Sequence, residues 1–272
     1  MNGPLGLHDV IARLHSLGTH SDAALEVWSS AGIDDRATAV FAAETAPLWA
    51  AGPAVVAAAI GACDRRGVEA GLVAARRSMS SNAARHVRWW AAGAAMRAAF
   101  GDGFDSREVC ECADLALEAA TSSPPVRVLE AGLLADQPTG PAHVALWASL
   151  GVLHARRLAI VHAVAVASGL TPCEGAELAR AAGTTSLTSG CNRCDAPESL
   201  AALGLADSRG ELTGEGLERC ARLDRILLDA ERWAWDAFGA QRTEALRDRL
   251  IALWSGAASE AIPQPSLVTV DR

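Results

Sequence analysis

The sequence predicts an all-α protein, with an N-terminal helical domain over residues 1–140 and a winged-helix-like domain with a small β-wing over 141–272. Half of the 272 residues are hydrophobic and alanine dominates them, and alanine is the strongest helix former. Strand-like runs of valine, isoleucine, threonine and aromatic residues are nearly absent, which disfavours extensive sheets. The wing is predicted from one tight turn, DSRG, between two short apolar segments near residue 208.

Apolar residues recur at helical spacing from residue 5 to residue 30, and we expect Gly18 to interrupt this helix. Asp34 and Asp35 precede the next helix, where aspartate is a typical N-terminal cap. The remaining N-terminal helices are predicted over residues 37–45, from 53, and over 66–77, 81–100 and 105–120.

The C-terminal part begins after two loops, 122–125 and 135–141, with a long helix over 142–168. A short helix over 174–183 and a turn-rich stretch follow. A further helix is predicted from Gly214 or Glu215, so the order of elements is that of a winged helix. Two amphipathic helices over 217–261 are expected to bury Trp233, Trp235 and Trp254 in the core.

The formal net charge of −8 argues against broad binding to nucleic acids or anionic membranes, which requires a positive surface. The sequence contains no lysine, so all 24 basic residues are arginines. Between 171 and 225 there are six arginines and nine acids, and six minus nine is −3. DNA binding is therefore disfavoured as a function of the winged helix, although it remains an alternative.

Cysteine usage and the amino terminus predict a cytoplasmic protein. The start MNGPLGLHDVIARLHSLG has no secretory pattern, and an odd number of cysteines, seven, is typical of reduced thiols. Cys191 and Cys194 have the spacing of half a zinc knuckle, which Cys173 and Cys220 could complete. That spacing is not a standard structural zinc pattern, so we expect no metal.

The apolar stretch 37–63 is long enough to raise the question of a membrane span. Pro47 and the Gly52-Pro53 pair break it, and its apolar residues are mostly alanine. A buried core of a soluble protein, without a membrane partner, is the expectation.

Glu44 is the one formally charged residue between Ala37 and Cys63. Loss of water on folding disfavours an ionised carboxylate, so its pKa should rise, which suits a general acid or base. The alternative is a glutamate that reaches solvent or caps a backbone amide, since a perturbed carboxylate marks a site only in some cases.

Other residues complete a candidate site for cofactor-free chemistry on a small molecule. His15 is predicted to relay protons or hold a leaving group, and Asp64 to pair with a cationic substrate. No dinucleotide, phosphate-loop, zinc-protease or nucleophile-elbow motif is present, so no cofactor is expected. The predicted substrate contacts are Asp35, Trp49, Arg85 and Arg88.

Leu14-His15, APLWAAGPAVV (46–56) and PAHVALW (141–147) are the first of several motifs along nearly the whole chain; together these motifs resemble the SalK-like family of actinobacterial helix-turn-helix proteins. APLWAAGPAVV (46–56) resembles its APLG-x-VGPEVV run, and PAHVALW (141–147) its P-H-L-A-L-W motif. Leu14-His15 resembles its LHA motif, LADSRGELTGEGLERCARLDRI (205–226) its wing, and WDAFGAQRTEALRDRL (235–250) its closing segment.

The chain departs from that family at polar positions. The family usually has arginine at the position of Glu44 and a His-Pro pair near Asp64, and its His-Arg-Gly-Asp-Gly-His run is RRLAIV at 156–161 here. Thr19-His20 replaces an aromatic pair. An inherited scaffold with exchanged polar groups fits an altered ligand or an acquired reaction, and fits drift equally well.

The preferred function is therefore a cofactor-independent enzyme of specialised-metabolite (antibiotic) biosynthesis. Its reaction would be an intramolecular displacement, elimination or ring closure, assisted by acid–base catalysis, on an amine-bearing small molecule. The alternatives are a ligand-responsive winged-helix transcription regulator and a non-catalytic binding or assembly protein. The C-terminal helices, rich in alanine, leucine and tryptophan, would suit a homo- or hetero-oligomer.

Overall fold

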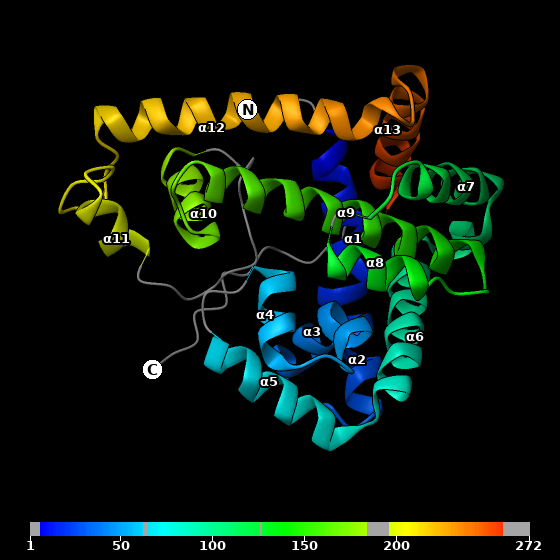
Figure 1. Cartoon of the computed structure of the whole chain (residues 1–272). Helices are drawn as coiled ribbons and strands as arrows, with labels where there is room; N and C mark the ends of the chain where they lie inside the picture. Colours follow the sequence, from blue (N-terminus) through cyan, green and yellow to red (C-terminus); the bar gives the residue numbers. More distant parts are fainter. Residues whose placement is uncertain (1–5, 62–64, 126, 184–195, 258–272) are drawn as a thin grey trace.

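The structure is a computed structural model that describes residues 6–61, 65–125, 127–183 and 196–257 (Figure 1). Its regular elements are helices, so the all-α prediction is confirmed for the described part of the chain. The elements are α1 Leu7–His20, α2 Asp22–Ser30, α3 Arg36–Thr45, the 3₁₀ turn η1 Ala46–Leu48, α4 Pro53–Ile60, α5 Arg65–Ser78, α6 Ser81–Phe100, the 3₁₀ turn η2 Gly101–Asp105, α7 Arg107–Thr121, α8 Val128–Ala135, α9 Ala142–Ala167, α10 Pro172–Ala181, α11 Ala196–Ala202, α12 Gly214–Asp236 and α13 Ala240–Gly256.

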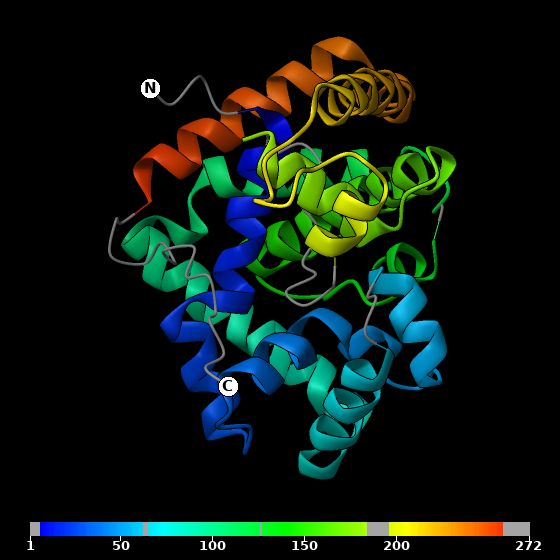
Figure 2. The same cartoon turned by 90° about the vertical axis from the view of Figure 1, so that its left-hand side faces the viewer.

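Helices α1 and α9 organise the larger hydrophobic core. The first half of α9 is buried against α1, α6, α7 and α8, and α13 returns to cover α1 and α7. Figures 1 and 2 show α12 running over α9 on the side away from α2–α5. The core is rich in alanine, which lets helix axes approach closely, with Trp28 and Trp147 filling the widest spaces.

The helix boundaries follow the capping residues. Asp35 caps α3 as predicted, accepting the Thr38 amide at 2.7 Å. Pro53 occupies the first turn of α4, also as predicted. The predicted break at Gly18 is wrong: Gly18 lies inside α1, and the chain turns at Ser21, which caps α2.

The winged-helix prediction is only partly confirmed. Helices α10, α11 and α12 follow α9 in the expected order, and α12 begins at Gly214 after the cap Thr213. The two wing strands are wrong: in the described residues the wing is reduced to one antiparallel bridge between Ala206 and Leu212. Asp207 explains this, because its side chain accepts the amides of Arg209 and Glu211 and closes a tight turn too short for a ladder.

A second, smaller hydrophobic cluster lies around this module. It is formed by the last turns of α9 together with α10, α11 and α12. Because α9 contributes to both clusters, it joins the two parts of the chain; the division into domains at residue 140 stays a prediction. Trp254 is buried in the larger core as expected, whereas Trp233 is 72% exposed, so its predicted core position is wrong.

The structure also bears on the predictions about the cysteines and about membrane-spanning segments. Cys173 is disulfide-bonded, so the prediction of seven reduced thiols is wrong there. Helix α9 is long and apolar enough to cross a membrane by length and composition, but most of that stretch is buried inside the protein, as in a core helix of a soluble protein. The apolar stretch 37–63 contains a bend of 103° between the α3–η1 segment and α4.

Candidate functional site

The candidate site begins where α1 crosses α9. The Trp147 indole donates a hydrogen bond to the backbone oxygen of His15 at 2.8 Å. A Cβ atom on Gly18 would overlap the indole ring, so only glycine allows this close approach of the two helices. On the α9 side a Cβ on Gly151 would lie 3.0 Å from the His15 Nε2 atom.

His15 is stacked between two α9 side chains. Its ring centroid lies 5.1 Å from that of Trp147 at an interplanar angle of 14°, and 5.3 Å from that of His154 at 29°. Within the described residues its Nε2 atom is buried and has no hydrogen-bond partner. The pair His15–His154 was not foreseen from the sequence, which placed only His15 at the site.

Both imidazoles are held in the neutral form. Burial, followed by the charges of His154 and Arg88, holds the pKa of His15 well below its ordinary value of 6.5. Burial, followed by Arg157, lowers the pKa of His154 to about 4. Near pH 7 each ring therefore offers one N–H donor and one lone pair.

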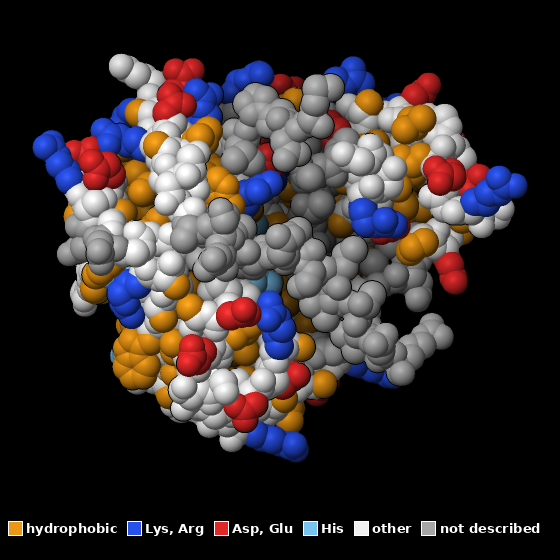
Figure 3. Space-filling view, turned by 180° about the vertical axis from the view of Figure 1, so that it is seen from behind, with side chains coloured by type: hydrophobic (Ala, Val, Ile, Leu, Met, Phe, Trp, Pro, Cys, Tyr) orange, Lys and Arg blue, Asp and Glu red, His pale blue; other side chains and the backbone are white. Residues whose placement is uncertain are grey.

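Both rings keep some accessible surface although protein surrounds them. Figure 3 shows histidine atoms at the base of a hollow near the centre of one face of the molecule.

Arg88, a predicted substrate contact, is 2% exposed and largely occupied by the protein. Its Nε donates to the Ala43 carbonyl at 2.9 Å, its Cζ lies 4.3 Å from the Trp147 ring centroid, and an Nη lies 4.0 Å from Asp136. Burial lowers its pKa to about 10, so it stays charged at pH 7. Arg88 thus connects α3 to the stacked rings and places a positive charge beside His15.

Arg85 pairs with the same Asp136 carboxylate through its Nε and an Nη atom. Asp136 is buried at the end of α8, so one carboxylate compensates two arginines of α6. The substrate-binding roles of Arg85 and Arg88 stay predictions, and Asp136 is the residue that the sequence analysis missed.

Glu44 lies on the solvent-accessible side of α3. Loss of water to the surrounding protein raises its pKa to about 7. Because its side chain is accessible to solvent, the raised pKa of Glu44 makes no contribution to the folding free energy. Glu44 lies two turns from Arg36, broadly on one side of α3, and Arg36 donates to the His20 carbonyl of α1 at 3.0 Å.

The other predicted site residues divide into three cases. Trp49 is buried, and its indole donates to the Thr45 hydroxyl at 3.1 Å, which makes it a core residue in this structure. Asp35 is exposed as a helix cap, and its hydrogen bond from the Thr38 hydroxyl is the main cause of its lowered pKa. Asp64 lies outside the described residues, and so do Cys191 and Cys194.

The three histidines of α9, His143, His154 and His162, contact different residues. His143 meets Phe104 edge-on, with ring centroids 4.9 Å apart, and its Nε2 lies 3.3 Å from Arg97. His162 lies 3.2 Å from Arg127. No group of three or more metal-ligating side chains is found in the parts of the chain that the structure describes.

The RRLAIV run at 156–161 contributes a buried ion pair. Arg156 Nε donates to Glu130 of α8 at 2.6 Å, and its other nitrogens donate to the carbonyls of Ala119, Ala120 and Ser123. Both side chains are buried. In this chain Arg156 of the run therefore fastens α9 to α7 and α8.

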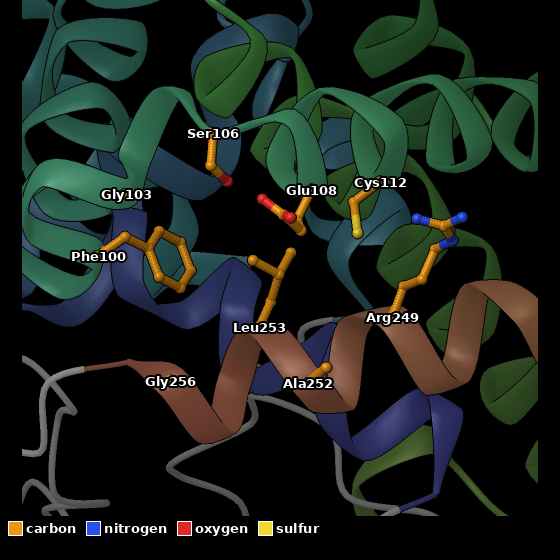
Figure 4. Close-up of a pocket in the computed structure, with 9 residues that line it drawn as sticks. All are labelled: Phe100, Gly103, Ser106, Glu108, Cys112, Arg249, Ala252, Leu253 and Gly256. Carbon is orange, nitrogen blue, oxygen red and sulfur yellow. The ribbon is translucent and has the colours of Figure 1, made fainter.

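A separate cavity of about 300 Å³ lies between α7 and α13 (Figure 4). The side chains of Phe100, Glu108 and Leu253 point into it, and the Cys112 thiol lies at its wall. Burial raises the pKa of that thiol to about 11, so it is not a nucleophile near neutral pH. None of the predicted site residues that the structure describes lines this cavity.

Comparison with known proteins gives one result. No curated protein and no solved structure matches this chain significantly. Residues 6–263 match the model of a helix-turn-helix family, which covers nearly the entire sequence. This chain therefore belongs to that helix-turn-helix family.

Proposed function

We propose that this protein is a cofactor-independent enzyme of specialised-metabolite biosynthesis that acts on an amine-bearing small molecule, with Glu44 of α3 and the histidine pair of α1 and α9 as its acid–base groups. The observation that carries the proposal is the stacked pair His15–His154, two imidazoles kept neutral near pH 7 by burial and neighbouring positive charge. Perturbed pKa values concentrate at functional sites, which supports this assignment.

Glu44 supplies the second element of the proposal. A carboxylate with a pKa of about 7 is poised to accept and return a proton at physiological pH. The sequence alone already predicted Glu44 as a general acid or base.

The reaction in this proposal is an intramolecular displacement or ring closure. Ionised Glu44 takes a proton from a substrate ammonium group, and the nitrogen lone pair forms a bond to a carbon of the same molecule. The bond from that carbon to its leaving group breaks, and the group departs with the electron pair. A neutral imidazole N–H of the histidine pair donates a hydrogen bond to the departing anion.

The resemblance to the SalK-like family supports a role in specialised metabolism, because the scaffold motifs of that family are kept while its polar positions differ. The residue at position 44 changes from the arginine usual in that family to glutamate. An exchange of charge at one position of an otherwise similar scaffold fits a new substrate with the opposite charge.

Deletion of the gene in its native host, followed by metabolite profiling, tests the proposal. We expect the wild-type gene to restore the lost product, whereas Glu44→Gln leaves its precursor accumulated, although the variant folds normally. Glu26→Gln, an exposed glutamate of α2, is the matched control and should restore the product. Full restoration by Glu44→Gln would remove Glu44 from the mechanism, and an unchanged metabolite profile after deletion would contradict the enzyme.

A ligand-responsive transcription regulator is the second candidate, and membership of a helix-turn-helix family favours it. Its weakness is electrostatic: Glu198 is the only charged residue in α11, the helix at the recognition position. Fluorescence anisotropy with DNA from upstream of the gene, at about 150 mM salt, separates the two functions. Saturable, sequence-specific binding there, lost in Arg209→Ala at the turn before α12, would favour the regulator.

A further inference from the structure

A large apolar groove lies between α9 and α12, and neither His15 nor His154 lines it. Its volume is about 710 Å³, which is within the range of small-molecule sites. It is lined mainly by aliphatic, alanine and tryptophan side chains of the two helices, with the loop at 122–125 contributing two prolines.

The groove offers no uncompensated charge to a ligand. Among the described residues that line the groove, Arg156 is the only charged one. Its guanidinium pairs with buried Glu130 and donates to three backbone carbonyls, so the protein uses four of its five N–H donors and neutralises its charge. A charged ligand would lose its water here without gaining a partner.

The lip of the groove is apolar and exposed. Trp233 is 72% exposed and Ile226 is 44% exposed, both on α12. Exposed large apolar side chains that gather around a concavity are typical of a binding surface. On the α9 side the exposed residue Ala163 lines the groove, and its small side chain leaves the space open because a larger one would project into it.

We propose that the groove between α9 and α12 binds one uncharged, apolar small molecule. The volume, the apolar lining and the neutralised Arg156 select such a ligand over an ion or a charged metabolite. The groove is formed by the two long helices that flank α10 and α11, so its occupant contacts both supports of the helix-turn-helix module. This site is independent of the reaction proposed for Glu44 and the pair His15–His154.

Titration of the full-length protein with the neutral fluorescent probe N-phenyl-1-naphthylamine tests the proposal. We expect saturable binding of one probe per chain. Ala163→Glu places a carboxylate in the groove at an exposed helical position, and we expect it to weaken binding about tenfold or more. Val166→Glu is the matched control: it lies on an exposed face of the same helix, is 59% exposed and does not line the groove, so its affinity should equal that of the wild type.

A second pair of variants tests the lip. Trp233→Ala should weaken probe binding, while Trp90→Ala, which removes a 64% exposed tryptophan of α6 away from the groove, should not. Circular dichroism establishes that all four variants are folded. Absence of saturable binding to the wild type, or equal affinities for Ala163→Glu and Val166→Glu, overturns the proposal. A wild-type dimer that Ala163→Glu dissociates, measured by light scattering, assigns the groove to a second copy and overturns it as well.

Discussion

Helix α9 packs in opposite ways along its length. Its first half crosses α1 so closely that a Cβ atom on Gly18 would overlap the Trp147 indole, and the polar groups at this crossing are fixed by Trp147 and Arg88. Its second half faces α12 across an apolar groove in which Ala163 and Trp233 remain exposed.

The difference teaches how one helix can provide two kinds of surface. Where small residues bring two helix backbones together, the buried polar side chains need hydrogen-bond partners. These hydrogen bonds hold the side chains rigid, which suits acid–base chemistry. Where alanine faces a more distant helix, the space between is left to be filled by something apolar.

The largest expected effect concerns the ion pair beneath the groove. Glu130→Ala leaves the Arg156 guanidinium charged and buried, so we expect a loss of about 3–5 kcal/mol in the free energy of unfolding. Urea denaturation measures it. Asp229→Ala, which breaks an exposed pair with Arg232, should change stability by less than about 1 kcal/mol. Similar losses in the two variants would show that the buried pair is not a structural anchor.

The next prediction tests the tight crossing itself. Gly18→Ala introduces a methyl group that overlaps the Trp147 indole, so the ring must shift and the bond to the His15 carbonyl weakens. We expect a loss of about 1–3 kcal/mol, measured as a lowered Tm. Gly214→Ala, at the first turn of α12 with open space around its Cβ position, is the control and should be neutral or slightly stabilising. An unchanged Tm in Gly18→Ala would mean that the crossing is looser than described.

A pH titration of stability tests the neutral histidine pair. Because the folded pKa of His154 is about 4 and its unfolded value is 6.5, the unfolded chain takes up the proton first as the pH falls. Stability present above pH 6.5 is therefore lost between pH 6.5 and pH 4, by at most about 3 kcal/mol. His154→Asn should reduce this loss, whereas His86→Asn on the exposed side of α6 should not. Parallel curves for the wild type and His154→Asn would contradict the pKa shift.

The smallest effect is expected in the groove. Ala163→Glu lies on an exposed helical surface, so the free energy of unfolding should change by no more than about 0.5 kcal/mol. A urea titration next to that of Val166→Glu makes the comparison direct. A loss of several kcal/mol would show that the groove closes tightly over Ala163, which would remove the contrast with the crossing.

Much of the secondary structure could be predicted from local signals. Pro53, Asp35 and Thr213 begin helices where their backbone preferences require it, and the long apolar run over 142–168 is helix α9. Helix α8 was missed, since its eight residues are too few for a clear apolar period. Gly18 was misread as a break because the sequence cannot show that a partner helix needs the missing side chain.

The candidate site was predicted only in part. Glu44 and His15 stood out as a charge in an apolar stretch and as part of a recognisable motif. His154, Asp136 and the Arg156–Glu130 pair had no local signal, because each acquires its role from a residue more than twenty positions away.

By itself the sequence determined the helical class, the positions of most helix ends and the negative net charge, since these depend on neighbouring residues and on composition. Only the tertiary structure decided that α1 and α9 bring His15, His154 and Arg88 together, and that α9 and α12 stay far enough apart to leave a groove. The physical reason is that helix spacing depends on which side chains meet across an interface, and that pairing is fixed when the whole chain packs.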